Sequence, residues 1–205
     1  MENKIIATSL EKGMSYQVYS ELIKQLVSKG KSTGPEQNAK RIEFTKLNVS
    51  RMRRLDKTIT IPKQAIAGFQ DVQEGQTWLV IIESWCADGA QTIPILNKIV
   101  EEIPSIDLKI VLRDENPELI DLFLTNGTRS IPKLIVLDNN KNVLNTWGPR
   151  SRRATKMVET YKSQNGKIDD QFKRSLQIWY NNDKGKSIIE DVANLATTSF
   201  FVEEN

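Results

Sequence analysis

Residues 78–94 read W-L-V-I-I-E-S-W-C-A-D-G-A-Q-T-I-P, and this stretch decides the fold. Its first five residues form an unbroken run of bulky and β-branched apolar side chains, which is too short for a comfortable helix and typical of a strand buried on both faces. Residues 84–89 are polar and turn-prone. Beyond them apolar residues recur at helical spacing, namely at Ala90, Ile93, Leu96, Ile99 and Val100. The stretch therefore predicts a buried strand, a tight turn and a helix.

The only cysteine of the chain, Cys86, falls at the predicted junction of this strand and this helix. A thiol there faces unpaired backbone N–H groups and the positive end of a helix dipole, which favour the nucleophilic thiolate. The alternative is an inert cysteine that packs in the core. A single cysteine rules out an internal disulfide framework, and a free thiol fits a reducing compartment. Cys86 is therefore the candidate catalytic residue.

Composition excludes several classes of function. The chain has no histidine, so it cannot form a Ser-His-Asp triad, a Cys-His dyad or the usual zinc clusters. No glycine-rich phosphate loop of either common type is present. The net charge of +3 gives no argument for nucleic acid. No run approaches the ~20 apolar residues of a membrane span, and the first residues lack a signal-peptide core. We expect no metal, no cofactor, no nucleic-acid or membrane partner, and a cytoplasmic location.

Two helices are expected before the central strand. Apolar residues at helical spacing over residues 19–26 predict the first, and residues 31–34 are interpreted as a linker. Pro35 is expected to open the second, which continues to about Leu55, because proline suits the first helical position. Its last turns carry three arginines, Arg51, Arg53 and Arg54. They indicate either a solvated helix end or an anion or partner site.

Strands and helices alternate through the rest of the chain. Residues 57–61 (K-T-I-T-I) alternate and predict an edge strand. The other predicted elements are a short helix after Pro62, strand 77–83, helix 88–102 with Pro94 inside it, strand 108–112, a helix from Pro117, the hairpin strands 132–137 and 142–147, and three helical segments after Ser151. Alternation of this kind gives a parallel core, and the hairpin adds antiparallel strands.

Two motifs in this pattern resemble those of the thioredoxin superfamily. Trp85-Cys86 and two spacer residues resemble its W-C-x-x-C motif, and Pro94 lies at the expected offset. Ile131-Pro132 resembles the family's isoleucine and cis-proline pair beside the active site. Gly148 resembles a glycine that lines the same groove. The resemblance implies an α/β fold with three layers, in which helices flank a mixed central sheet.

The resemblance also predicts how the chain is divided. A thioredoxin-like domain is expected over residues 57–163, with added helices at both termini, in residues 1–56 and 164–205. More narrowly, the chain looks like a bacterial branch of thioredoxin-like proteins. The residues expected to form the groove and its motifs are Trp85, Ala87, Asp88, Gly89, Ile131, Pro132 and Gly148.

The chain departs from the family at two positions. Gly89 stands where the resolving cysteine is expected, so any cycle through Cys86 must be monothiol. Val80 stands where thioredoxins bury an aspartate, and the nearest acid, Glu83, is expected near solvent at the strand end. Asp88 would disfavour a thiolate by like-charge repulsion, against the effect of the helix dipole.

Three functions follow from these features. The first is a monothiol thiol-disulfide oxidoreductase or thiol redox sensor, which would form mixed disulfides with a protein or a small thiol through Cys86 and serve cell redox homeostasis. The second is a redox-inactive protein-binding module with a thioredoxin fold. The third is a small-thiol transferase of glutaredoxin type, which needs cations around the groove, and Lys133 and Arg150 are the candidates. The oligomeric state is not readable from the sequence.

Overall fold

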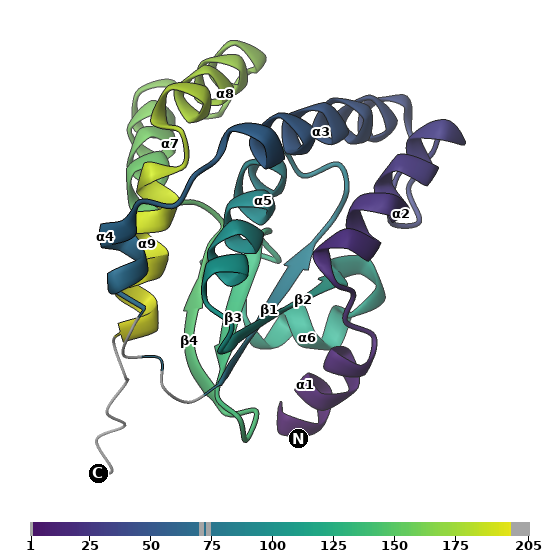
Figure 1. The fold of residues 1–205 in the computed structure, drawn as a ribbon. Coiled ribbons are helices and arrows are strands. Elements are labelled where there is room, and N and C mark those ends of the chain that lie inside the picture. The colour runs from purple at the N-terminus through teal and green to yellow at the C-terminus, as the bar shows by residue number, and fades with distance from the viewer. Residues whose placement is uncertain (1, 70–71, 73–74, 198–205) are drawn as a thin grey trace.

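A computed structural model of the protein describes residues 2–69, 72 and 75–197 (Figure 1). Within these residues one sheet has four strands, in the order β2-β1-β3-β4. They are β1 (Gln76–Ile82), β2 (Ile106–Leu112), β3 (Lys133–Leu137) and β4 (Val143–Trp147). β1 pairs in parallel with β2 and antiparallel with β3, and β3 pairs antiparallel with β4. The mixed sheet was predicted correctly.

Helices lie on both faces of this sheet, which makes the three layers of the predicted fold (Figure 1). The helix after the central strand, α5 (Ala87–Glu102), covers one face, and the short α6 (Pro117–Leu122) lies on the other. The remaining helices are α1 (Glu2–Glu11), α2 (Tyr16–Ser28), α3 (Ala39–Thr58), α4 (Lys63–Ala67), the single 3-10 turn η1 (Arg113–Glu115), α7 (Arg152–Asn165), α8 (Asp170–Asp183) and α9 (Lys186–Thr197).

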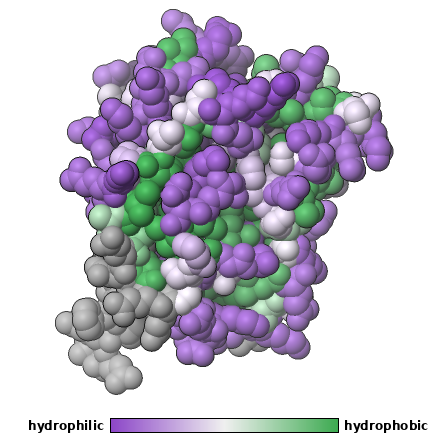
Figure 2. Space-filling view, viewed as in Figure 1, coloured by the Kyte–Doolittle hydropathy of each residue, from purple (hydrophilic) through white to green (hydrophobic). Residues whose placement is uncertain are grey.

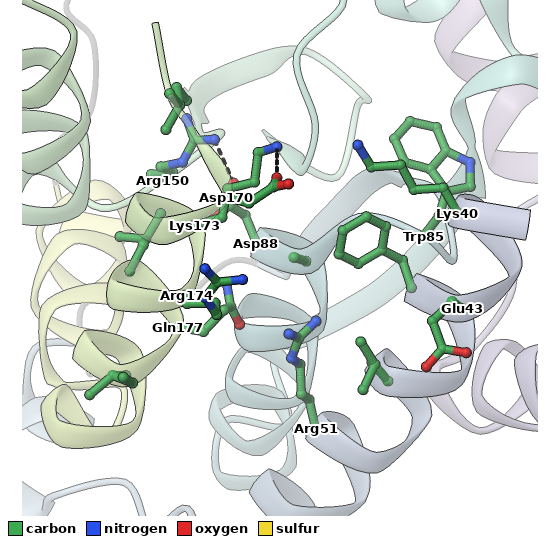
Figure 3. A pocket seen from close by; sticks show the side chains of 16 residues that line it. Lys40, Glu43, Arg51, Trp85, Asp88, Arg150, Asp170, Lys173, Arg174 and Gln177 are labelled. Atoms are coloured by element: carbon green, nitrogen blue, oxygen red, sulfur yellow. Dashed lines mark hydrogen bonds and ion pairs between the residues drawn. The ribbon is translucent and has the colours of Figure 1, made fainter. Parts of the chain in front are cut away.

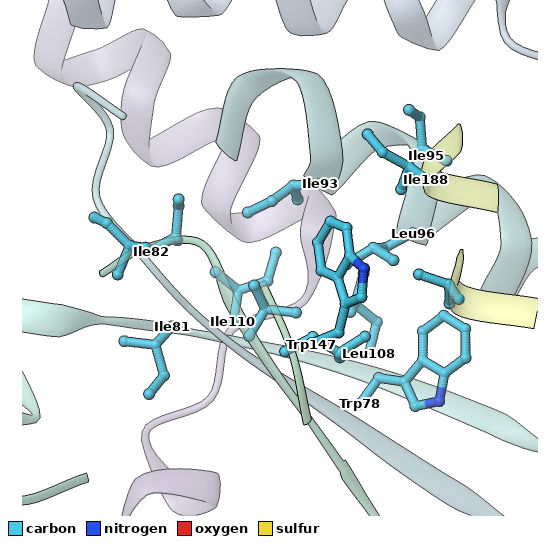
Figure 4. Packing of buried hydrophobic residues seen from close by; sticks show 14 of the residues in the cluster. Trp78, Ile81, Ile82, Ile93, Ile95, Leu96, Leu108, Ile110, Trp147 and Ile188 are labelled. Atoms are coloured by element: carbon cyan, nitrogen blue, oxygen red, sulfur yellow. The ribbon is translucent and has the colours of Figure 1, made fainter. Parts of the chain in front are cut away.

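The hydrophobic core lies between the sheet and α5. The two central strands are apolar on both faces, and β3 is buried along its whole length. Figure 4 shows side chains of β1, β2 and α5 meeting in this layer, among them Trp78, Ile110, Ile93 and Leu96. On the face shown in Figure 2, apolar side chains gather in the middle of the molecule, between hydrophilic borders. Burial of these side chains is the main force that holds α5, and hence Cys86, against the sheet.

Local capping explains where the long helices begin. The side chains of Ser15, Asn38, Ser151 and Asp169 each accept a hydrogen bond from the backbone N–H group three residues later. The prediction that Pro35 opens α3 was wrong, because Asn38 caps this helix and it begins at Ala39. The non-helical segment that begins at residue 31 therefore continues to Asn38.

One further prediction needs correction, and one helix was not predicted. Residues 57–61 do not form an edge strand, because α3 continues to Thr58 and the Ile59 N–H still donates to the Leu55 carbonyl. Ile59 is buried and packs against the core from the end of α3. α1 was not predicted, since its residues show little helical periodicity.

In the part of the chain that the structure describes, each helix is too short or too polar to span a membrane.

Candidate functional site

Cys86 is the N-cap residue of α5. Its Sγ accepts a hydrogen bond from the Gly89 N–H and donates one to the Ile131 carbonyl oxygen. The donor and acceptor atoms of each bond are 3.4 Å apart. The Ile131–Pro132 peptide bond is cis. Cys86 as a whole residue is only 8% exposed. The structure thus brings the predicted cysteine and the Ile131-Pro132 pair into direct contact.

Gly148 lies against the same loop. Its φ of +120° favours glycine, and a Cβ built there would stand 2.2 Å from the Pro132 carbonyl oxygen. The peptide bond between Gly148 and Pro149 is also cis, which was not predicted. Gly148 therefore packs against the Ile131-Pro132 pair, whose Ile131 carbonyl contacts Cys86.

The environment of Cys86 favours the neutral thiol. Burial raises its pKa to about 12, and the nearby carboxylate of Asp88 acts in the same direction. The hydrogen bond from the Gly89 N–H and the charge of Arg150 lower the pKa, but their combined effect is smaller. The helix N-terminus was expected to favour thiolate, and here it does not outweigh burial.

A side chain at position 89 would have to displace Ile82. A Cβ on Gly89 would lie 2.1 Å from Cδ1 and 3.0 Å from Cγ1 of Ile82, which fills the space under the first turn of α5. Ile82 is the last residue of the central strand and is almost fully buried. The loss of a second cysteine is therefore accompanied by packing that closes its place.

Asp88 is held by two partners on other elements. One carboxylate oxygen lies 2.6 Å from the guanidinium of Arg150, and the other accepts a hydrogen bond of 2.9 Å from the Tyr180 hydroxyl on α8. Burial nevertheless raises the pKa of Asp88, against the influence of Arg150 and Tyr180. Because Arg150 is committed to Asp88, it is not free to hold the carboxylate of a small thiol.

Lys133 and Glu83 are both buried. Burial lowers the pKa of Lys133, the first residue of β3, and this lysine is not among the residues that line the cleft described below. Glu83 was predicted to lie near solvent, which was wrong, because its exposure is 0%. Its carboxylate accepts hydrogen bonds from the Thr33 hydroxyl and the Asp114 N–H. Burial raises the pKa of Glu83.

A buried polar network supports the turn before Cys86. Thr33 donates its N–H to the Ser84 hydroxyl, and the Ser84 N–H donates to the Thr33 hydroxyl. From α3, Thr45 bonds the Ser84 hydroxyl and Asn48 donates to the Ser84 carbonyl. Sequence reasoning missed these partners, because residues 31–34 look like an ordinary linker. No local pattern indicates that Thr33 contacts a residue about 50 positions later in the chain.

Trp85 lies between two arginines. The Arg41 guanidinium lies 4.4 Å and that of Arg113 5.0 Å from the Trp85 ring. Cation–π contacts of this kind fix the indole without burying it completely. Trp85 thereby becomes a rigid part of the surface beside the first turn of α5.

A cleft of about 740 Å³ opens over this motif. Its two walls are α3 and the segment from Ile168 into α8 (Figure 3). The turn with Trp85, Ala87 and Asp88 lines it between these walls and is called its floor. The cleft was not predicted, because it depends on the packing of α8 beside a helix more than a hundred residues earlier.

Comparison with known proteins places this fold and motif in a family. A family model described as thioredoxin matches residues 34–162, which is more than half of the chain. The chain therefore belongs to the thioredoxin family. Within that family it is a single-cysteine protein with the motif W-C-A-D-G. The search of curated proteins finds no match.

Two solved structures share the fold over almost the whole chain. A protein of unknown function from Pseudomonas aeruginosa is 18% identical, with a TM-score of 0.59 over 92% of this chain and 95% of that one. An HIV epitope scaffold is also 18% identical, with a TM-score of 0.53 over 89% of this chain and 97% of that one. At this identity the likeness shows the fold alone. The match of the family model begins before residue 57, and the predicted division at residues 56 and 163 stays a prediction.

Proposed function

We propose that this protein is a thioredoxin-fold binding module that holds its partner in the cleft over the W-C-A-D-G motif and does not exchange disulfides. The observation that carries this proposal is the state of Cys86. Its thiol is buried, its pKa is raised to about 12, and a carboxylate lies nearby. Disulfide exchange needs an accessible thiolate, so this site disfavours the first step.

The position of Gly89 supports the same proposal. A dithiol enzyme resolves its mixed disulfide with a second cysteine, and this chain has one cysteine only. The packing of Ile82 against Gly89 means that a larger residue there would have to displace the Ile82 side chain. The parts of the site that remain are the apolar and cationic walls of the cleft, which are suited to binding.

Monothiol exchange is the second candidate. It is favoured by the position of the Cys86 Sγ at the N-terminus of α5 and next to the Ile131 carbonyl. It would require the site to open, since the thiol is almost fully buried. The glutaredoxin-type reading has less support, because Arg150 is paired with Asp88 and Lys133 is buried.

Reduction of insulin disulfides in the presence of dithiothreitol tests the proposal. The wild-type protein and the matched variant Cys86→Ser are compared with a thioredoxin as positive control. We expect both forms of this protein to give the rate of dithiothreitol alone. A wild-type rate clearly above that of Cys86→Ser would mean that Cys86 exchanges disulfides and that the proposal is wrong.

A further inference from the structure

Two arginines extend into the cleft from opposite walls. Arg51 comes from α3 and Arg174 from α8, and Figure 3 shows both side chains directed toward the middle of the cleft. Among the described residues, no ion pair within 4.0 Å includes either of them. Arg51 donates to the Asn48 side chain, which is neutral. Burial lowers the pKa of Arg51, so its charge is partly desolvated.

The acids near these arginines have other partners. Asp88 acts on Arg51 electrostatically, but its carboxylate is paired with Arg150. Asp169 and Asp170 act on Arg174 in the same way. Asp170 is paired with Lys173, and Asp169 accepts hydrogen bonds from the Tyr161 hydroxyl and the Phe172 N–H. Because each of these acids has another partner, none of them neutralises the two arginines fully.

The whole lining carries an excess of positive charge. It contains five cationic side chains (Lys40, Arg51, Arg150, Lys173 and Arg174) against three acidic ones (Glu43, Asp88 and Asp170), an excess of two. An anion placed between the walls would therefore be attracted by the cleft as a whole. The guanidinium group suits a carboxylate in particular, since its planar fork can donate two parallel hydrogen bonds.

The rest of the lining is apolar. Phe44 and Leu47 contribute from α3, Trp85 from the floor, and Ile168 and Ile178 from the opposite wall. Leu47 is 41% exposed and Ile178 58%, although both are large apolar side chains. A ligand with an aliphatic part would cover them and release water. The volume of about 740 Å³ lies in the range of small-molecule sites, about 300–1,000 Å³.

We propose that the cleft binds a small amphiphilic carboxylate, with its acid group between Arg51 and Arg174 and its aliphatic chain over the apolar lining. This inference rests on the proposed function and names the class of its ligand. It assigns Arg51 to the anion site that the sequence left open for the arginines of α3. Arg53, on another face of the same helix, lines a separate small depression.

Calorimetric titration of the full chain tests this assignment, with dodecanoate as the probe below its micelle concentration. Dodecanol and acetate serve as the probes that lack the acid group or the chain. We expect dodecanoate to bind more tightly than either. Arg51→Gln and Arg174→Gln should each weaken dodecanoate about tenfold, which corresponds to about 1.4 kcal/mol, and should leave dodecanol unchanged. Arg53→Gln is the matched control and should have no effect. Leu47→Ser should weaken both dodecanoate and dodecanol.

Three results would overturn the inference. They are no binding of dodecanoate, equal binding of dodecanoate and dodecanol, or an equal effect of Arg51→Gln and Arg53→Gln. The first of these results, together with binding of an acidic peptide, would identify a peptide as the ligand instead. If any of these occurs while insulin reduction stays independent of Cys86, the ligand class is wrong and the binding module without disulfide exchange stands. Reduction that depends on Cys86 would instead overturn the proposed function itself.

Discussion

At the scale of single residues, Asp88 and Gly89 modify the effect of burial on the Cys86 thiol. Asp88 adds a negative charge near a buried thiol, and the Gly89 N–H supplies a hydrogen bond that compensates only in part. Burial contributes more than either of them. The Cys86 side chain is therefore a neutral thiol in this turn. In a more open site, a cysteine at the same position beside a helix N-terminus could be a thiolate.

Asp88→Asn should make Cys86 more acidic. The change removes the nearby negative charge and frees Arg150, and both effects lower the pKa of the thiol. We expect the midpoint of Cys86 alkylation to move to lower pH than in the wild type. Asp107→Asn is the control, since Asp107 is also paired, with Lys109, but lies at the other end of the sheet. An unchanged midpoint in Asp88→Asn would show that the carboxylate does not act on the thiol.

Gly89→Ala should destabilise the protein by about 1–3 kcal/mol, because the added methyl group overlaps Ile82. Helix propensity alone would give the opposite sign, since alanine is the better helix former by about 1 kcal/mol. Ile82→Val removes Cδ1, the atom that the new methyl group would overlap. In the wild type we expect this change to lower the free energy of unfolding by about 0.5–1.5 kcal/mol. In the Gly89→Ala protein it should lower it much less. Urea unfolding of the four proteins measures this coupling. Additive losses would mean that Gly89 is not closed by Ile82.

At the scale of elements, the site depends on helices that come from distant parts of the chain. α3 supports the turn before Cys86 through Thr45 and Asn48, and α8 reaches Asp88 through Tyr180. α9 in turn holds the start of α7, because the Asp191 carboxylate accepts hydrogen bonds from the Arg152 N–H and the Trp147 indole. The site is thus built by α3, which lies inside the family match over residues 34–162, together with α8 and α9, which follow it.

Asp191→Asn should lower the free energy of unfolding by about 1–2 kcal/mol, because this buried carboxylate bonds a backbone N–H and an indole. We expect one unfolding transition in urea, shifted as a whole, because α9 packs against β4 and α5. Glu190→Gln, at the exposed neighbouring position, should change stability little. A separate early transition in Asp191→Asn would contradict this and would show that the C-terminal helices unfold by themselves.

The sequence predicted the elements near Cys86 better than those that surround them. The apolar run of β1, the helical spacing of α5 and the hairpin of β3 and β4 are strong local patterns, and they gave these elements nearly correct bounds. Residues 57–61 show only a short alternation, which the continuation of α3 overrode. The contacts of Thr33 and Tyr180 with the site join residues far apart in sequence, and local patterns carry no information about them.

At the scale of the whole molecule, the buried thiol links the site to global stability. The folded protein holds the proton of Cys86 up to a pKa of about 12, whereas an exposed cysteine loses it with a pKa of ~8.5. Above pH 9, ionisation of the exposed thiol therefore stabilises the unfolded chain, while the thiol of the folded chain stays protonated and gives no such stabilisation. Stability from this group is complete below about pH 8.5 and is lost as the pH rises toward about 12.

Cys86→Ser should remove this part of the alkaline loss. At pH 7 the variant should be about as stable as the wild type, because serine is a good N-cap residue and can accept the Gly89 N–H. Between pH 9 and 11 it should lose less stability than the wild type. Both proteins also contain Tyr16 and Tyr19, whose pKa values are raised by burial, so only the difference between them reports Cys86. Parallel losses in urea unfolding at these pH values would count against a buried neutral thiol.

The rate of Cys86 alkylation by iodoacetamide against pH, in the native wild-type protein, tests the central claim most directly. A thiol closed to exchange should react very slowly at pH 7, and its rate should rise only above pH 9, with a midpoint toward about 12. A midpoint below the ~8.5 of a free cysteine would show an activated thiolate. That result would contradict the binding module and make monothiol exchange the function of this site.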